Sequence, residues 1–471
     1  FRTKRDILIN MKMKKYYIVS LCTLLITTFS SCKKFLDTQS PSNFTEEVSF
    51  SNLDFAEKAV LGIYYNFGET NLYAYNLSAF YPCDNDIEHV SGADDANGRK
   101  TLCRYNATSG NSSLLKTWTL LYQSIERANV CIDNLPLSPI WNGASSTQAR
   151  RLYGEAKAIR AWCYYELIRN WGDVPFSVKA VQSGDNYYLP KTDRDVIYEF
   201  LIEDLKEAIE FVPWLSEVGT TERVNKAFVK GLRARLALTY AGYSLRNETL
   251  ETRRGRNWQN GYYQIARDEC FDVIKSGKHH LNPNFGNVFK KMHAYSLDLE
   301  YGEVLFEVAM GRLYSGRIAE VIGMNHITNP LDTKHGRAIA EVQTNPYYFY
   351  SFDNADTRRN ISVELYGYGD GSALGKQRLS TAASMRICKW RRSWITPSMG
   401  GALSSVQVTG VNWPLMRYAD IVLMFAEAEN EVNDEPTADA KNALSMIRNR
   451  AFPQSSYNDK VTNYIASNRL V

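Results

Sequence analysis

Hydrophobic and polar positions follow the period of an amphipathic α-helix through most of the chain. Two long stretches with this period are "LLKTWTLLYQSIERANVCIDNL" and "GEAKAIRAWCYYELIRNWGDVPF". In the second, Gly172 and Pro175 predict the end of the helix. Five more segments share the period: "DVIYEFLIEDLKEAIEFV", "VNKAFVKGLRARLALTYAGY", "YYQIARDECFDVIKSG", "RYADIVLMFAEAENEV" and "ADAKNALSMIRNRA". The chain is therefore predicted to be mainly α-helical.

One of these segments carries a stripe of small residues on a single helix face. Small side chains let a neighbouring helix backbone approach closely, as in stacked antiparallel helix pairs of the tetratricopeptide type. The spacing between the pairs is irregular here, which predicts a degenerate helix-pair array rather than a regular solenoid. The stripe consists of Ala227, Gly231, Ala234, Leu238 and Ala241.

The helical period is interrupted in two places by glycines, prolines and aromatic clusters. The longer interruption spans about 281–414 and contains the strand-like "EVLFEVAM" and the aromatic "NPYYFYSFDNADTRRN"; the shorter one runs from Tyr73 to Asn111. Long irregular segments in a compact domain are usually functional or disordered, and the aromatic content of these two argues against disorder. We therefore expect a helical scaffold over about 44–280 and 415–452, with a loop-rich insertion over about 281–414.

The N-terminal segment has the pattern of a bacterial lipoprotein signal peptide. Basic residues precede a short apolar run, Tyr16 to Phe29, which is interrupted by serine and threonine and is shorter than the roughly 20 residues of a membrane span. Ser30, Ser31 and Cys32 follow, and a cysteine at this position resembles a lipobox whose thiol receives a lipid. We expect residues 1–31 to be upstream residues and signal peptide, and 32–471 to be the body. The alternative is a signal peptide without lipidation, in which Cys32 is incidental.

Composition and charge narrow the function further. The formal net charge is only +4 over 471 residues and no dense basic stripe is found, so nucleic acid is not expected as a partner. The chain contains 30 tyrosines, against 20 phenylalanines and 9 tryptophans. Tyrosine suits half-exposed positions because its ring is apolar and its hydroxyl remains in water.

The remaining cysteines show no metal-binding spacing. Cys131, Cys163 and Cys270 fall within apolar helical patterns and are predicted to fill the core. Cys83 and Cys103 lie in a loop-rich stretch of an exported chain, so a disulfide between them is one alternative. No cofactor is expected.

Three stretches were tested for chemistry and none supports catalysis. The carboxylates of "AEAENE" cannot converge, because Glu427 and Glu431 share a helix face while Glu429 points away. "DGSALGKQ" lacks the first glycine and the Ser/Thr of a phosphate loop. "DNDIEHVSG" suggests a bound cation, but His89 replaces the glycine that a calcium loop needs. We predict neither a metal site nor an enzyme.

Taken in order, several motifs resemble the SusD/RagB family of outer-membrane nutrient-binding lipoproteins of Bacteroidetes. The resemblance implies a lipid-anchored protein that binds a glycan, or in some members a peptide or glycopeptide, and delivers it to a SusC-like TonB-dependent transporter. It also implies a position at the cell surface. The motifs are "SCKKFLDTQSP", "EAKAIRAWCYYELIRNWGDVPF", "GLRARLALTYAGY", "CFDVIKSGKHHL", "DLEYGEVLFEV", "NADTRRN", "NWPLMRYADIVLMFAEAENEV" and "ALSMIRNRA".

The resemblance also implies a further C-terminal helix, which would begin near "TNYIASNRLV", where this chain stops at Val471. We interpret the sequence as truncated. The helix that contains Ile447 is then expected to lack part of its cover.

Candidate ligand-binding residues are the aromatic and polar side chains of the two irregular regions. Flat rings suit the C–H faces of sugars, and neighbouring amides and carboxylates bond to hydroxyl groups. If "YYFY" is extended, only alternate rings can face a ligand. A helical-repeat adaptor without a small ligand remains the second hypothesis. The candidates are Tyr75, Tyr81, Asp84, Asn85, Tyr105, Tyr314, Tyr347, Tyr350 and Trp394.

Overall fold

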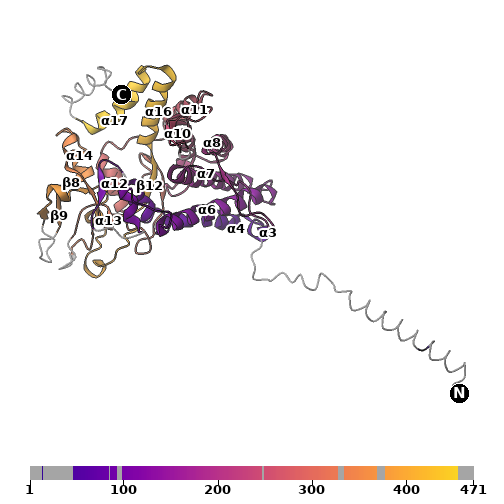
Figure 1. Cartoon of the computed structure of the whole chain (residues 1–471), viewed down its shortest axis with the longest axis horizontal. Coiled ribbons are helices and arrows are strands. Elements are labelled where there is room, and N and C mark those ends of the chain that lie inside the picture. Colours follow the sequence, from indigo (N-terminus) through magenta and orange to yellow (C-terminus); the bar gives the residue numbers. More distant parts are fainter. Residues whose placement is uncertain are drawn as a thin grey trace. The chain divides into compact units, whose positions relative to one another are not determined.

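Figure 1 shows the computed structural model of the chain. It describes Met13 and residues 46–453, apart from residue 84 and the segments 93–97, 247–248, 327–333 and 369–376. Cys32, Asp84 and nearly all of "DGSALGKQ" therefore lie outside the described residues. The chain divides into two units, residues 1–48 and 49–471, and the fold below is that of the second. Among the described helices, none combines the length and apolar character that crossing a membrane requires.

The scaffold is a series of long helices in which each packs against the next (Figure 1). Helix α6 packs on α7, α7 on α8, α8 on α10 and α10 on α11. Helix α11 then packs on α16. These two helices are neighbours in space, although the whole loop-rich segment lies between them in the sequence. The predicted mainly helical fold is confirmed. The scaffold helices are α4 (Leu53–Tyr65), α6 (Ser112–Asn134), α7 (Ser146–Trp171), α8 (Arg194–Phe211), α10 (Lys226–Ala241), α11 (Tyr262–Lys275), α16 (Tyr418–Asn433) and α17 (Ala438–Ala451).

Local sequence signals explain where these helices begin and end. The Asn111 side chain accepts hydrogen bonds from the first backbone N–H groups of α6, and Asp193 and Asn225 do the same for α8 and α10. Helix α7 ends at Gly172, whose φ of 79° is accessible to glycine at little cost. The predicted stop at this position is confirmed.

The small-residue stripe on α10 lets side chains of neighbouring elements approach closely, rather than a helix backbone. A Cβ atom at Gly231 would lie 2.3 Å from Met416 Sδ and 2.5 Å from Ile421 Cδ1. Glycine at this position therefore makes room for β12 and α16, and α10 becomes the centre of the main hydrophobic core.

Short helices and small antiparallel sheets fill the segments between the scaffold helices. The largest sheet has the strand order β1-β7-β11-β8, and the two-stranded sheets pair β9 with β10, β6 with β12, β2 with β3, and β4 with β5. The strand expected in "EVLFEVAM" is confirmed as β6. The strands are β1 (Glu88–Val90), β2 (Val174–Pro175), β3 (Lys191–Thr192), β4 (Ser244–Leu245), β5 (Thr252–Arg253), β6 (Val304–Val308), β7 (Val342–Thr344), β8 (Val363–Glu364), β9 (Tyr366–Tyr368), β10 (Gln377–Leu379), β11 (Arg386–Ile387) and β12 (Trp413–Arg417).

The two irregular regions share a second hydrophobic core, to which Phe80, Phe289 and Trp390 contribute. This core explains how a segment without long helices holds a fixed shape. The shorter helices are α3 (Glu46–Ser49), α5 (Asn76–Ala79), α9 (Leu215–Val218), α12 (Phe285–His293), α13 (Ile318–Val321), α14 (Pro346–Ser351) and α15 (Arg359–Ser362), and the 3₁₀ turns are η1 (Asn66–Gly68), η2 (Tyr81–Cys83), η3 (Arg99–Arg104), η4 (Leu135–Leu137), η5 (Ala382–Ser384), η6 (Arg392–Trp394) and η7 (Gly401–Leu403).

Three expectations about individual segments need correction. No disulfide joins Cys83 to Cys103, whose thiols donate to the backbone oxygens of Ala79 and Phe80. Ile447 does not lack cover, because it is buried in the main core. The "YYFY" segment is helical, in α14, because Pro346 fits the first turn of a helix and the Asn345 side chain caps it. Cys131, Cys163 and Cys270 fill the core as predicted, and Cys388 is buried as well.

Candidate ligand-binding site

A pocket with a volume of about 520 Å³ opens between the C-terminal end of α4 and the segment that follows β6. We call it the tyrosine pocket, because the rings of Tyr65 and Tyr314 stand on its walls. Both are unusually exposed for aromatic side chains, at 66% and 89% of their full surface. Its polar groups come from Glu69, Thr70, Ser315 and Arg317.

A tight turn holds Tyr314 away from the body of the protein. The backbone N–H of Tyr314 donates to Gly311 O at 2.9 Å, and the Ser315 hydroxyl accepts from the N–H of Gly311 at 2.9 Å. Gly410 packs so closely behind the turn that a Cβ atom there would lie 2.3 Å from Arg312 Cα. The backbone of the turn is therefore fixed, so a ligand that stacks on Tyr314 has only the side-chain torsions of the ring left to order.

Arg317 is held in place by a buried tyrosine and a buried carboxylate. Its guanidinium carbon lies 4.4 Å from the centre of the Tyr75 ring, within the range of a cation–π contact. Its Nε and Nη2 atoms donate to one oxygen of Glu320, at 3.0 and 2.6 Å. The backbone N–H of Arg317 donates to Ala74 O, which joins the two irregular regions. The charged wall of the pocket is thus rigid.

Tyr65 and Glu69 form a second polar pair among the residues that line the pocket. A hydrogen bond from the Tyr65 hydroxyl to the Glu69 carboxylate, together with the charge of that carboxylate, raises the pKa of Tyr65. Both groups remain in contact with water, so the pair can exchange its mutual hydrogen bond for bonds to a ligand. A carboxylate accepts hydrogen bonds from two neighbouring hydroxyl groups of a sugar.

The chemistry of the pocket is that of recognition rather than of reaction. Exposed rings offer flat apolar faces, while the guanidinium donates and the carboxylate accepts hydrogen bonds. Within the part of the chain that the structure describes, no group of three or more His, Cys, Asp or Glu side chains is placed to hold a metal ion. The carboxylates of "AEAENE" serve the scaffold: Glu431 lies 3.9 Å from Arg254, and Glu429 accepts from the Thr437 hydroxyl.

Of the residues predicted from the sequence, Tyr314 lines the tyrosine pocket and Tyr75 lies beneath it. Tyr75 is buried, and burial raises its pKa to about 12, so it supports Arg317 instead of meeting a ligand. Tyr81 and Trp394 are half-buried: Tyr81 packs against Trp171, and Trp394 lies under the Arg391 guanidinium at 4.6 Å.

The remaining candidates lie elsewhere. Tyr105 is exposed at the end of η3. Asn85 caps the turn that leads into β1, and it precedes the strand that pairs with β7. Tyr347 and Tyr350 follow β7 on α14, three residues apart and both exposed. The structure thus brings Asn85, Tyr347 and Tyr350 to one end of the β1–β7 pair.

Sequence reasoning missed Tyr65, Glu69 and Arg317. Tyr65 is the last residue of an amphipathic stretch, "LDFAEKAVLGIYY". The helical period places Tyr64 and Tyr65 in the same helix, but it does not show which of the two rings is packed and which is exposed. A usable signal was present, because "YYNFGET" places two tyrosines and an acidic residue directly before a turn.

Residues 278–471 match the SusD family, and residues 34–238 match a family described as starch-binding and associating with the outer membrane. The chain belongs to the SusD/RagB family. The glycan-binding proteins of this family are non-catalytic, which confirms the expectation that the chain is not an enzyme.

Individual relatives agree with this assignment. The SusD-like protein P25 of Formosa agariphila is 22% identical, with 93% of this chain and 82% of that protein covered. The crystal structure of a SusD homologue from Bacteroides thetaiotaomicron superimposes with a TM-score of 0.74 at 22% identity, covering 88% of this chain and 83% of the other. Surface glycan-binding protein A from the same species, in complex with laminarihexaose, gives 0.65 at 18% identity and covers 87% and 86%.

Proposed function

We propose that this protein is a cell-surface lipoprotein that captures a glycan in the tyrosine pocket and passes it to a SusC-like TonB-dependent transporter. The observation that carries the proposal is the pair of exposed rings, Tyr65 and Tyr314, which face a pocket with a fixed guanidinium. Tyr314 belongs to the longer irregular region, and Tyr65 is the last residue of the scaffold helix α4.

The choice of a glycan over a peptide rests on the relatives. One solved structure of this fold is named as a complex with laminarihexaose, another as a complex with a xylogluco-oligosaccharide, and the matching family is described as starch-binding. The pocket is consistent with such a ligand, because its volume is within the range of about 300–1,000 Å³ that is typical of small-molecule sites. A peptide or glycopeptide is the alternative ligand.

The anchor and the transporter are proposed from sequence and family. Lipidation at Cys32 would attach the body to the outer membrane, because each buried methylene contributes about 0.8 kcal/mol and two or more chains hold a protein stably. Delivery requires release, so the affinity should be moderate; a micromolar dissociation constant corresponds to about −8 kcal/mol.

A second candidate function, the docking of another protein on the helices, is favoured by a different pocket. This cavity of about 720 Å³, the scaffold pocket, lies between α6 and the segment after α7. Trp118, Tyr122 and Tyr187 line it, and Tyr187 is largely exposed. It shares no lining residue with the tyrosine pocket, so the two functions can be separated by mutation.

Affinity electrophoresis of the purified body tests the proposal. Laminarin, xyloglucan and starch are each cast into a native gel, and we expect at least one to retard the protein. Alanine at Tyr314 should restore normal mobility, while alanine at Tyr187 should not. Thin-layer chromatography after overnight incubation should show no shorter products; cleavage would transfer the assignment to a glycoside hydrolase. Retardation by none of the three, or retardation lost only with the Tyr187 variant, would contradict the proposal.

A further inference from the structure

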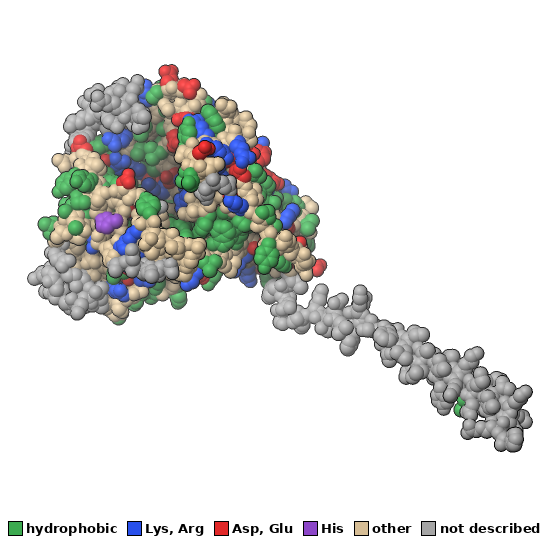
Figure 2. Space-filling view, viewed as in Figure 1, with side chains coloured by type: hydrophobic (Ala, Val, Ile, Leu, Met, Phe, Trp, Pro, Cys, Tyr) green, Lys and Arg blue, Asp and Glu red, His purple; other side chains and the backbone are tan. Residues whose placement is uncertain are grey.

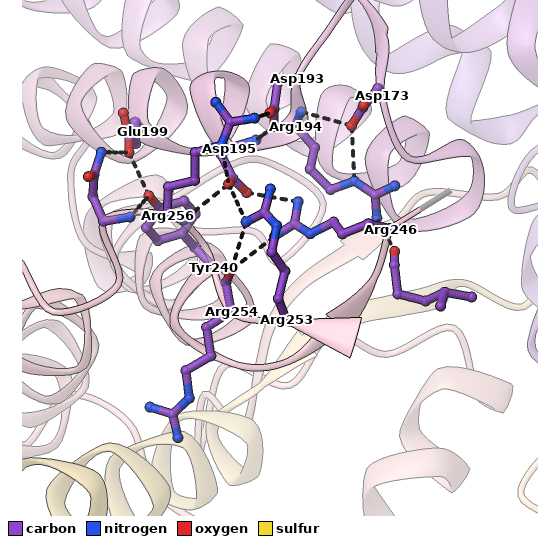
Figure 3. Close-up of polar contacts among 12 residues, drawn as sticks. Asp173, Asp193, Arg194, Asp195, Glu199, Tyr240, Arg246, Arg253, Arg254 and Arg256 are labelled. Atoms are coloured by element: carbon purple, nitrogen blue, oxygen red, sulfur yellow. Dashed lines mark hydrogen bonds and ion pairs between the residues drawn. The ribbon is translucent and has the colours of Figure 1, made fainter. Parts of the chain in front are cut away.

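A second polar pocket lies beside the N-terminal end of α8, and arginine dominates it (Figure 3). Its volume is about 610 Å³. Its walls include the strands β4 and β5 and the segment that continues from β5 to Trp258. We call it the arginine pocket. Figure 2 shows basic and acidic side chains gathered over the part of this face where Figure 1 labels α8 and α10. The arginines that line it are Arg194, Arg246, Arg253, Arg254 and Arg256.

The charges of the arginine pocket do not balance. Two aspartates, Asp173 and Asp193, line it together with the five arginines, and Asp195 lies beneath them. Glu431 approaches Arg254 to 3.9 Å from the side of α16. Among the described residues, positive charge therefore remains in excess after every acidic contact is counted.

The hydrogen-bonding capacity is also largely unused. Five guanidinium groups offer about 25 N–H donors. They donate six hydrogen bonds to other described residues, among them Arg253 to Asp195 and Arg256 to Asp193. In addition, Arg246 Nη1 forms an ion pair with Asp195 at 2.8 Å. Arg246 is buried, and its Nε atom has no acceptor in the part of the chain that the structure describes.

The backbone that carries these arginines is fixed by the scaffold (Figure 3). A Cβ atom at Gly255 would lie 2.5 Å from the Tyr240 ring, so only glycine lets the segment lie flat on α10. The N–H of Arg256 donates to Asp195, and the N–H of Asn257 donates to the Tyr240 hydroxyl at 2.9 Å. Such preorganisation lowers the entropy that a ligand would have to overcome.

Aromatic rings stand at the rim of the same pocket. The Arg254 guanidinium carbon lies 4.2 Å from the centre of the Trp258 ring and 4.8 Å from that of Tyr243. Tyr243 is largely exposed, so one face remains available. Arginine held against aromatic rings keeps its planar fork of donors in a fixed orientation, which suits bidentate bonding to an oxyanion.

We propose that the arginine pocket binds the anionic group of an acidic saccharide, a sulfate ester or a uronate carboxylate. This inference rests on the proposed function in one respect, namely that the ligand is a sugar. The ring of the sugar would lie against Tyr243 or Trp258, and the oxyanion would accept hydrogen bonds from Arg253 and Arg256, the two most accessible guanidinium groups that end in the pocket. One arginine lines the tyrosine pocket and five line the arginine pocket, so the two pockets would select differently charged parts of a glycan.

A saccharide is favoured over a lipid head group as the occupant. Basic pockets can also hold anionic lipid head groups, but the arginine pocket has Tyr243 and Trp258 among its lining residues, and flat rings suit the C–H faces of a sugar. Binding of vesicles is therefore one outcome of the test.

Isothermal titration with a matched pair of probes tests the inference. The probes are a carrageenan-derived tetrasaccharide with one sulfate per disaccharide and the same tetrasaccharide after chemical desulfation, with a tetragalacturonate as the uronate probe. We expect at least one acidic probe to bind at least tenfold more tightly than the desulfated one. Its affinity should fall as salt rises, because ion pairs with the ligand are screened.

Variants locate the binding within the protein. The double substitution Arg253→Gln and Arg256→Gln should reduce the affinity for the acidic probe at least tenfold. The control Arg267→Gln removes a charge from α11, where Asp268 is the only partner of Arg267 among the described residues, and should change the affinity less than twofold. Arg253→Lys keeps the positive charge but lacks the planar set of donors of a guanidinium group. The affinity of this variant should fall by less than that of the double variant and by more than that of the control. Circular dichroism spectra and melting temperatures show whether each variant is folded.

Three results would overturn the inference: equal binding of sulfated and desulfated probes, no effect of the double substitution in a folded protein, or binding of phosphatidylglycerol vesicles with no binding of either acidic probe. The Tyr314→Ala variant separates the two claims. If neutral glycans bind through Tyr314 and acidic probes show no preference, only the inference fails. If acidic probes bind through the arginines and no glycan depends on Tyr314, the proposed site of the main function fails.

Discussion

The Arg317 guanidinium lies 4.4 Å from the centre of the Tyr75 ring, so a buried aromatic face supports a charged wall of the tyrosine pocket. Tyr75 also contacts Arg99 at 5.1 Å, and the ring is thus held between two guanidinium groups. The contact joins the segment after η1 to the segment after β6, two regions far apart in sequence. It gives Tyr75 a positioning role that is distinct from contact with a ligand.

Replacement of Tyr75 should therefore affect binding indirectly. Tyr75→Leu removes the ring beneath Arg317, and we expect the glycan affinity to fall several-fold, since a cation–π contact contributes about 0.5–2 kcal/mol. Tyr75→Phe is the matched control. Its lost hydroxyl has no hydrogen-bond partner among the described residues, so affinity should be unchanged. Titration calorimetry compares the two variants; equal losses would show that the ring does not act through Arg317.

Tyr314 should affect binding without affecting stability. Because the ring is almost fully exposed, Tyr314→Ala removes little buried surface, and the melting temperature should stay within about 1 °C. Loss of a stacking ring should weaken glycan binding by about 1–2 kcal/mol, roughly five- to thirtyfold. Tyr347→Ala, at a ring of similar exposure on α14, is the control and should bind normally. An unchanged affinity for Tyr314→Ala would remove this ring from the site.

Two glycines on scaffold helices should respond to alanine in opposite directions. At Gly231 the new Cβ would overlap Met416 and Ile421, and overpacking of this kind costs about 1–3 kcal/mol. At Gly62 on α4 a Cβ would meet nothing within 4 Å, so the higher helix propensity of alanine should stabilise the protein by about 0.5–1 kcal/mol. Urea denaturation measures both. A stabilising Gly231→Ala would show that β12 and α16 do not pack as closely as described.

Acid should destabilise the protein through His293. This side chain is fully buried; Nδ1 lies 2.7 Å from Phe289 O, and Nε2 accepts from the N–H of Arg391 at 3.0 Å, which fixes the neutral form with the proton on Nδ1. Burial lowers the pKa of His293 to about 4. Because the unfolded chain takes up a proton near pH 6.5 and the folded chain does not, this contribution is complete above pH 6.5 and is lost as the pH falls toward 4.

The size of the effect can be measured by denaturation at two pH values. Between pH 7 and pH 5 the free energy of unfolding should fall by about 2 kcal/mol through this group alone. His293→Gln keeps a donor and an acceptor but does not titrate, so its free energy of unfolding should change less over the same interval. An identical pH dependence in both proteins would mean that His293 is not held in the neutral form.

The scaffold helices could be predicted well from the sequence, because amphipathic periodicity and capping residues act locally. Gly172 ends α7 and Asn111 begins α6 as their residue types imply. The insertion was harder, since its order depends on contacts between distant segments. The helix at "YYFY" follows from Pro346 and Asn345, which outweigh the strand preference of the aromatic residues.

The binding residues could be predicted only in part, for a physical reason. Composition shows that tyrosines are numerous in the irregular regions, but whether a ring is exposed depends on what packs over it. Tyr75 and Tyr314 look alike in sequence; one lies beneath Arg317 and the other stands on a fixed turn. The arginines of "TRRGRNW" form a short basic run, and only the fold adds Arg194 and Arg246 to make a pocket.

The most direct test of the central claim is a calorimetric titration of the purified body, and of its Tyr65→Ala/Tyr314→Ala double variant, with the oligosaccharide of whichever polysaccharide retards the protein in the gel. We predict saturable binding with one site and a micromolar dissociation constant for the unmodified protein, and no detectable heat for a folded double variant. Unaltered binding by the double variant would contradict the claim that these two rings form the glycan site.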